Sequence, residues 1–185
     1  MEGPVITFLC IILVSWLTLG ACLAGRRTPG YCHWRHTISE LGASGAPHEQ
    51  ATRFALFLPT GLMAALIAML FLQNSNAAAA SLAAFIAVGY LSASIFPVDE
   101  GAPLHGTRAN FWHNLGGMLM YFGGGVSLIA AHQQTPAFTM AGGLSLVGLA
   151  GLSPNTPARY RGRIQRLVEM IFFGALVGHS LSGFA

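Results

Sequence analysis

Apolar residues occur in six long runs along the chain, and short polar segments separate these runs. Each run has roughly the 20 residues that a helix needs to cross a hydrocarbon core about 30 Å thick. The runs are continuous in Leu, Ala and Ile, whereas the strands of a membrane barrel alternate apolar and polar residues. We therefore predict an all-α fold, a polytopic membrane bundle of six transmembrane helices that forms a single domain over residues 1–185. The predicted spans are Val5–Ala24, Thr52–Leu72, Ala78–Phe96, Asn110–Ala131, Pro136–Leu152 and Ile164–Gly183.

Polar turn residues mark the ends of the predicted helices. The pairs Thr135–Pro136 and Thr156–Pro157 suit the N-cap and first positions of the fifth and sixth helices, because the hydroxyl accepts an N–H bond there and proline has no N–H to satisfy. The segment Asn74–Asn76 ends the second helix. Pro59 lies inside the second run, where a proline interrupts helical hydrogen bonding and predicts a kink.

Composition strengthens the membrane interpretation. Hydrophobic residues make up 54% of the chain and charged residues only 8%, whereas soluble domains carry about 25% charged residues. This composition excludes a soluble globule, and it also excludes a nucleic-acid-binding chain, which needs dense positive charge. We expect membrane lipids, and not nucleic acid, as partners.

All nine basic residues are arginines, and they lie in or beside the first, third and fifth connections. The second and fourth connections have none. Arginine and lysine accumulate on the cytoplasmic side of membrane proteins. The distribution therefore predicts that Gly45, Gly101 and Asn155 are cytoplasmic and that both chain termini lie outside.

The first connection, residues 25–46, is long for a link between membrane helices and contains His36, Ser39 and Glu40. Long ordered connections often carry function. A serine and a carboxylate in an apolar-flanked segment are candidate catalytic groups, and His36 is a candidate substrate-binding residue. The alternative is an interfacial segment in which Tyr31 and Trp34 anchor the chain at the headgroup level.

The third connection collects Asp99, His105, Arg108 and His113. Asp99 and His113 are candidate catalytic residues, and Arg108 is a candidate substrate-binding residue. Imidazole nitrogens and carboxylate oxygens are also usual zinc ligands, so Asp99, His105 and His113 are candidate ligands of a divalent metal such as zinc. The spacing matches no strict metal signature such as HExxH. A capped turn with ordinary ion pairs and a metal-free polar substrate site are the alternatives.

The sixth predicted span carries Glu169 some 6 Å beyond the start of its apolar part, at about 1.5 Å per residue. Ionisable residues inside a bilayer usually face a partner or a water-filled cavity, so Glu169 is a candidate catalytic residue. Arg163 and Arg166 precede it near the headgroup level and are candidates for holding a phosphate-bearing substrate. The alternatives are a structural pair between Glu169 and Arg166, and arginines that only set the orientation.

Small residues recur at four-residue steps in the same span, at Gly174, Gly178 and Ser182. This spacing lets membrane helices approach closely. The three residues are therefore a candidate face for a helix–helix oligomer.

Three strings resemble one family of membrane proteins. HTISELGASGAP is followed by FPVDEG and then by LHGTRANFWHNLGG, and together these are similar to the bacterial and archaeal proteins grouped as domain of unknown function 998. The most specific parts are Ile38–Gly42, Phe96–Asp99 and His113. Members often carry cysteine where this chain has Val98, so a thiol role there does not transfer. The resemblance implies a six-span protein of a bacterial cytoplasmic membrane, and it implies no established reaction.

The candidate catalytic residues all fall at the predicted cytoplasmic membrane edge. The leading hypothesis is a membrane-embedded hydrolase or transferase, metal-assisted or not, that acts on a lipid or other amphipathic molecule and uses a carboxylate or histidine as general base. Membrane hydrolases of the ceramidase and progestin-receptor type are an analogy only, because their HxxxH pair does not occur here. The alternatives are a small transporter or binding protein, and an accessory subunit of a membrane complex. The broken helices and internal repeats of transporters are not evident.

Overall fold

Long helices joined by short turns make up the computed structural model, which describes residues 2–133, 135–152 and 156–182. These residues contain no strand, so the predicted all-α fold with six long helices is confirmed. The long helices are α1 (Glu2–Arg27), α3 (Leu58–Gln73), α4 (Ala77–Ile95), α5 (Arg108–Ala130), α6 (Pro136–Gly151) and α7 (Ala158–Ser182). The short elements are η1 (Ser39–Gly42), α2 (Glu49–Ala51), η2 (Thr52–Phe57) and η3 (Ala131–Gln133).

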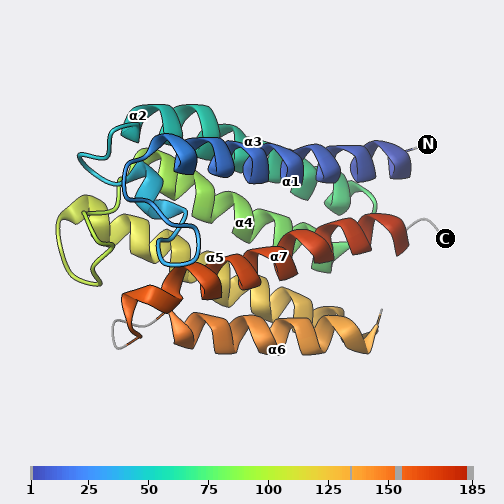
Figure 1. The fold of residues 1–185 in the computed structure, drawn as a ribbon. Helices are drawn as coiled ribbons and strands as arrows, with labels where there is room; N and C mark the ends of the chain where they lie inside the picture. The colour runs from blue at the N-terminus through green and yellow to red at the C-terminus, as the bar shows by residue number, and fades with distance from the viewer. Residues whose placement is uncertain (1, 134, 153–155, 183–185) are drawn as a thin grey trace.

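The long helices form a closed bundle (Figure 1). Long helices that follow one another in the chain pack side by side, and α7 completes the ring by packing against both α6 and α1. α7 also contacts α4 and α5, so one of its faces points into the bundle. Glycines permit the closest approach, since a Cβ atom on Gly142 of α6 would lie 2.5 Å from the carbonyl oxygen of Gly125 in α5.

Several helices begin where the turn chemistry places them. Thr135 caps α6 by accepting a hydrogen bond from the backbone N–H of Ala137. Asn76 caps α4 in the same way, so the polar segment that ends the second helix also begins the third. α7 starts at Ala158, one residue after the predicted Thr156–Pro157 pair.

The second predicted helix is longer than the sequence indicated and contains a wide turn. α2, η2 and α3 form one run from Glu49 to Gln73, and η2 has π-helical geometry. Pro59 follows η2 closely and lacks the N–H that would bond to the carbonyl four residues earlier. A π-helical turn is one way in which a helix accommodates such an interruption. η2 lies close to Pro59, where the sequence predicted a kink.

Among the described residues, four helical segments are long and apolar enough to cross a membrane. They are Gly3–Arg27, Glu49–Gln73, Ala77–Ile95 and Ala158–Ser182. α6 is apolar but has only 16 residues, and α5 is not among the four. The chain is an integral membrane protein, and the predicted crossing by α5 and α6 stays a prediction.

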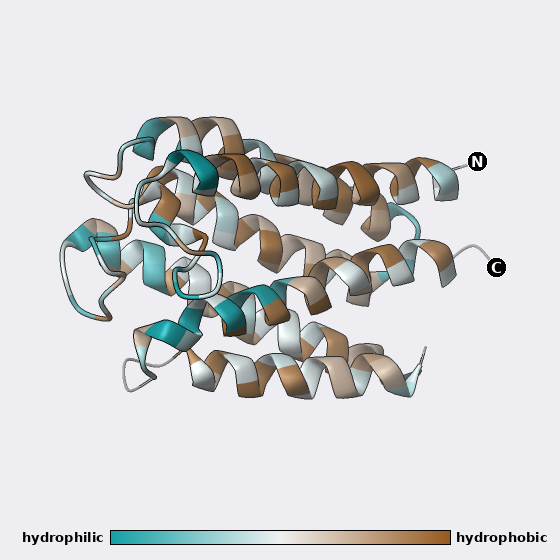
Figure 2. Cartoon of the chain, in the orientation of Figure 1, coloured by the Kyte–Doolittle hydropathy of each residue, from teal (hydrophilic) through white to brown (hydrophobic). Residues whose placement is uncertain are grey.

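Polar residues gather at one end of the bundle (Figure 2). The first and third connections lie there, whereas α1 begins and α7 ends at the opposite end (Figure 1). The arginines in the last turn of α1 belong to this polar end. Its cytoplasmic location stays a prediction. The marker position Asn155 and the predicted boundary Gly183 lie outside the described residues.

Candidate active site

The first and third connections touch at the polar end of the bundle. The backbone N–H of Ser44 donates to the carbonyl oxygen of Val98 at 2.9 Å, and Val98 is fully buried. This contact holds η1, which begins at Ser39, near the start of α5, which carries His113. Two segments that are distant in the sequence therefore contribute to one place in the fold.

His113 joins these segments through both of its ring nitrogens. Nδ1 lies 2.9 Å from the carbonyl oxygen of Phe96, and Nε2 lies 3.0 Å from Ser39 Oγ. A carbonyl oxygen can only accept, so Nδ1 carries a proton. In the neutral ring Nε2 then offers a lone pair, to which the Ser39 hydroxyl donates. The three groups have the order hydroxyl, base and orienting acceptor that activates a nucleophile.

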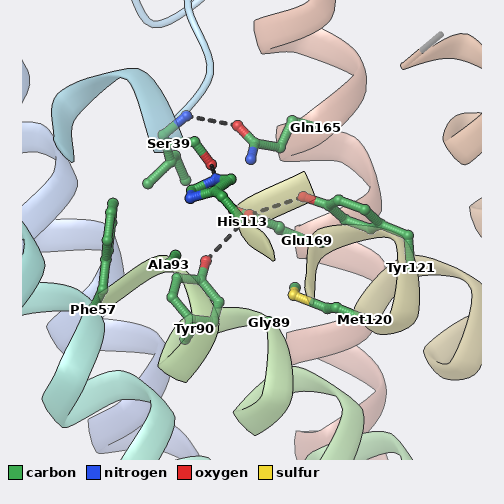
Figure 3. Close-up of a pocket in the computed structure, with 12 residues that line it drawn as sticks. Ser39, Phe57, Gly89, Tyr90, Ala93, His113, Met120, Tyr121, Gln165 and Glu169 are labelled. Carbon is green, nitrogen blue, oxygen red and sulfur yellow. Dashed lines mark hydrogen bonds between the residues drawn. The ribbon is translucent and has the colours of Figure 1, made fainter. Parts of the chain in front are cut away.

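Ser39 and His113 face a small cavity inside the bundle (Figure 3). Its volume is about 50 Å³, which suffices for a few water molecules or a small reacting group, since one water needs about 10–15 Å³. Tyr90 from α4, Tyr121 from α5 and Glu169 from α7 also line the cavity. His113 is buried and Ser39 is half-buried, so the serine lies where the cavity meets the polar end.

Glu169 supplies a buried carboxyl group to this cavity (Figure 3). Its Oε1 accepts hydrogen bonds from the hydroxyls of Tyr90 at 3.1 Å and Tyr121 at 3.3 Å. Gln165 lies one turn earlier in α7, and its Oε1 accepts the backbone N–H of Ile38 at 2.6 Å. This bond fixes the amide orientation and leaves Nε2 as the donor of Gln165 at the cavity wall.

Arg166 ties the first connection to α7. Its Nη1 donates to the carbonyl oxygen of His36 at 3.0 Å, and its Nη2 donates to Tyr31 Oη at 2.7 Å and to His33 Nδ1 at 3.0 Å. The alternative ion pair between Arg166 and Glu169 does not form. The ion pair found among the described residues joins Arg53 and Glu49. Arg166 therefore positions the connection, and its expected role in binding substrate stays a prediction.

Burial is the main cause of the shifted pKa values of Tyr31 and His33, which contact Arg166. It raises the pKa of Tyr31 to about 12, although the neighbouring Arg166 charge acts in the opposite direction. Burial also lowers the pKa of His33, and the charges of Arg166 and Arg26 add to that effect. Both groups are therefore neutral at pH 7, as the hydrogen bonds from the Arg166 guanidinium require.

Glu40 and Asp99 shape the connections and do not line the cavity. Glu40 Oε1 accepts the backbone N–H of Thr37 at 2.7 Å and its hydroxyl at 3.0 Å. Asp99 accepts the backbone N–H of Thr107 at 2.7 Å and its hydroxyl at 2.8 Å, and Thr107 is the N-cap of α5. The structure thus shows at Asp99 the capped turn that the sequence offered as an alternative, and a catalytic role for Asp99 stays a prediction.

The candidate metal ligands do not assemble. Within the described parts of the chain, no three His, Cys, Asp or Glu side chains form a group that could hold a metal ion. His105 is exposed, Asp99 bonds to Thr107, and His113 bonds to Ser39. The predicted zinc-type set of Asp99, His105 and His113 is therefore not formed, because Asp99 and His113 bond to different neighbours and no third ligand among the described residues joins either of them.

The other candidate substrate-binding residues lie outside the cavity. Arg108 and Arg163 are exposed, and Arg163 lies 5.9 Å from the ring centre of Trp34. His36 Nδ1 accepts the backbone N–H of Cys32 at 2.9 Å. Of the predicted site residues, the structure brings Ser39, His113 and Glu169 together. Neither Arg163 nor Arg166 lines their cavity.

The prediction missed Tyr90, Tyr121 and Gln165. The two tyrosines lie within apolar runs, where aromatic residues give no sign of a polar site. Gln165 did carry a signal, because it lies four residues before Glu169 and therefore on the same face of a helix.

One of the three small residues of α7, Gly174, Gly178 and Ser182, packs against another helix of the same chain. Gly178 packs against the ring of Phe138 in α6. Gly174 has open space beside it and Ser182 is exposed. An oligomer through this face stays a prediction.

Comparison with known proteins gives one match. The model of a family described as protein of unknown function (DUF998) matches residues 9–182, which is nearly the whole chain. No curated protein and no solved structure matches it.

Proposed function

The chain belongs to the DUF998 family of proteins of unknown function, and we propose that this member is a membrane-embedded serine hydrolase or acyltransferase. The substrate is an acyl ester of a lipid or another amphipathic molecule. One observation carries the proposal: Ser39 donates to His113, His113 donates to the Phe96 carbonyl, and the pair borders an internal cavity.

The relay meets the geometric requirements of an activated nucleophile. A serine hydroxyl is a weak nucleophile unless a base within hydrogen-bonding distance takes its proton. His113 is at that distance, and the Phe96 carbonyl holds the ring in the tautomer that leaves Nε2 free to accept. A backbone carbonyl here occupies the orienting position that a carboxylate fills in the best known triads.

The reaction follows from these positions. Ser39 Oγ attacks the ester carbonyl carbon while its proton moves to His113 Nε2. The carbon–oxygen bond to the alcohol then breaks, and His113 gives that proton to the leaving oxygen. Water or a second hydroxyl next attacks the acyl group on Ser39, again through His113, which releases the acid or the transferred ester and restores the serine.

Other cavity residues supply the remaining functions. Gln165 Nε2 donates a hydrogen bond to the oxyanion that forms on the carbonyl oxygen, a type of contact that contributes strongly to acyl transfer. Glu169, held by Tyr90 and Tyr121, gives the cavity a polar wall that retains water for the second step. Without that wall, an apolar pocket of this size would stay dry.

The size of the cavity limits what enters it. About 50 Å³ admits the ester group but not an acyl chain, so the chain of the substrate remains among the surrounding lipids. The distribution of the arginines supports a site at the headgroup level of the cytoplasmic leaflet, with both chain termini outside. The membrane in this proposal is a bacterial cytoplasmic membrane.

Glu169 supports a second candidate function. A carboxyl group that is 6% exposed and accepts bonds from two tyrosines is also suited to bind a proton or cation in a small transporter. This alternative needs no contribution from the Ser39 hydroxyl. Loss of function in a serine variant therefore separates the two candidates.

The test is hydrolysis of a medium-chain ester by the purified protein in phosphatidylcholine vesicles. We expect Ser39→Ala to reduce turnover to the background rate and His113→Ala to reduce it at least about a hundredfold, since a general base contributes roughly 10²–10⁴. Ser44→Ala is the matched control, because Ser44 is exposed in the same connection.

Two results would contradict the proposal. One is equal turnover by Ser39→Ala and the parent protein. The other is a loss of turnover in Ser44→Ala as large as that in Ser39→Ala, which would show that any change in the connection disables the protein. Ser39→Ala removes one hydrogen bond, so we expect the fold to stay intact, and circular dichroism checks this expectation.

A further inference from the structure

A long apolar groove runs along the outside of the bundle between α1 and the α2–η2 segment. Its volume is about 600 Å³. Ile11, Trp16, Leu19 and Leu23 form the wall on α1, and Ala55 lies on the η2 side. The four large side chains on α1 are between 45% and 64% exposed. In a membrane protein such an apolar face is covered by lipid chains.

The groove changes from apolar to cationic at the polar end of the bundle. Arg27, the last residue of α1, and His48, just before α2, line that end. Arg26 stands beside Arg27 and is also exposed. Positive charge at the level of the headgroups complements a lipid phosphate, and an arginine can grip two phosphate oxygens at once.

A hydroxyl inside the groove has no partner in the part of the chain that the structure describes. Thr52 lines the groove and is 4% exposed, and its Oγ1 hydrogen-bonds to none of the described residues. Unsatisfied buried hydroxyls are costly. Thr52 lies about one helical turn from His48, at the depth where the ester carbonyls of a phospholipid follow its phosphate.

The length of the groove also suits a lipid. Ile11 and Arg27 are separated by 16 residues of continuous helix, which corresponds to about 24 Å at 1.5 Å per residue. One leaflet of the hydrocarbon core is about 15 Å thick. An acyl chain that starts near Thr52 therefore fits within the groove.

We propose that this groove is a binding site for an anionic phospholipid, with its phosphate at Arg27 and His48 and an acyl chain along Trp16. The proposal concerns a lipid that stays intact, on the other side of η2 from the cavity. Within η2, Leu56 and Thr52 line the groove, whereas Phe57 lines the cavity. Binding here does not depend on whether Ser39 is a nucleophile.

Trp16 provides a direct reporter. The chain has three tryptophans, so replacing Trp34 and Trp112 by Phe leaves only the one in the groove. The protein is reconstituted into phosphatidylcholine vesicles that contain a fixed fraction of lipid brominated on its acyl chains, because bromine quenches tryptophan fluorescence on contact. Brominated phosphatidylglycerol is compared with brominated phosphatidylcholine.

We expect stronger quenching of Trp16 by the brominated phosphatidylglycerol, with a relative association constant of about five or more. Arg27→Gln should lower that preference about fivefold, as expected for one arginine near a membrane surface. Ala55→Phe fills the groove and should weaken quenching by both lipids. Ala84→Phe, at an exposed alanine of α4 outside the groove, is the matched control and should change neither.

Equal quenching by the two lipids in the parent protein would overturn the proposal, and this comparison needs no variant. A preference for phosphatidylglycerol that survives Arg27→Gln would also overturn it. Equal effects of Ala55→Phe and Ala84→Phe would show that the acyl chain does not lie in the groove.

Discussion

The hydrogen bonds between Arg166 and the first connection lead to the strongest structural prediction, because a single side chain holds this connection on α7. Arg166→Ala removes hydrogen bonds to Tyr31, His33 and the His36 carbonyl. Each is worth about 1 kcal/mol net, so the loss is about 3 kcal/mol. Because these bonds join the connection to the rest of the fold, Arg166→Ala should lower the free energy of local opening of the connection and leave the stability of the bundle unchanged.

Hydrogen exchange measured by mass spectrometry on residues 31–42 tests this estimate. A loss of about 3 kcal/mol lowers protection there on the order of a hundredfold, whereas peptides from α4 should be unchanged. Ester turnover should fall as well, because Ser39 lies in the released segment. Arg166→Lys should be intermediate, since a lysine keeps the charge but loses the planar fork.

Arg163→Ala is the control one turn earlier in α7. Arg163 is exposed and its guanidinium lies over the Trp34 ring. The protection pattern of Arg163→Ala should therefore match the parent within about threefold, as for an exposed contact worth about 0.5 kcal/mol. Equal protection of residues 31–42 in Arg166→Ala and Arg163→Ala would refute the reasoning.

Three further predictions concern packing, pH and orientation. A Cβ on Gly162 would lie 2.5 Å from a backbone carbonyl oxygen of the first connection, so Gly162→Ala should destabilise the protein by about 1–3 kcal/mol. Gly174 has open space beside it, so Gly174→Ala should stabilise the protein by about 0.5–1 kcal/mol. Thermal unfolding of the two variants in detergent tests both expectations. His33 has a lowered pKa in the folded protein, so the unfolded chain binds the proton more readily and stability should fall as pH drops below about 6.5. His33→Asn should flatten the pH dependence of the melting temperature between pH 7 and 5, and an equal slope in both proteins would contradict the assignment. Single cysteines at Gly45 and Gly101 should be labelled only from the cytoplasmic side; labelling from outside would reverse the orientation.

Much of the fold was predictable because membrane helices depend on local sequence. Continuous apolar length and Thr–Pro pairs determine where such helices form and begin, and α6 begins at Pro136 as predicted. The π-helical turn at Thr52–Phe57 was not predictable in form, although Pro59 indicated an interruption. The crossing of the membrane by α5 and α6 stays a prediction, because the length and hydropathy of the described helices single out four other segments as clear spans.

The site was predictable in part, since polar residues in an apolar chain need partners. Ser39, His113 and Glu169 stood out for that reason, and they meet in the fold. Asp99 and Glu40 stood out equally, but their oxygens satisfy backbone N–H groups of nearby turns. Sequence alone does not distinguish these cases, because a capping carboxylate and a catalytic carboxylate have the same local pattern. The pairing of Ser39 with His113 depends on how the bundle closes.

The central claim is that Ser39 is a nucleophile activated by His113, and covalent labelling tests it most directly. The purified protein in vesicles is treated with a fluorophosphonate, and the adduct is located by peptide mass spectrometry. The account predicts one adduct, on Ser39, that forms at least about a hundredfold more slowly in His113→Ala and at the parent rate in Ser44→Ala. An adduct that forms on Ser39 at the same rate without His113, or a protein that hydrolyses the ester while Ser39 stays unmodified, would contradict it.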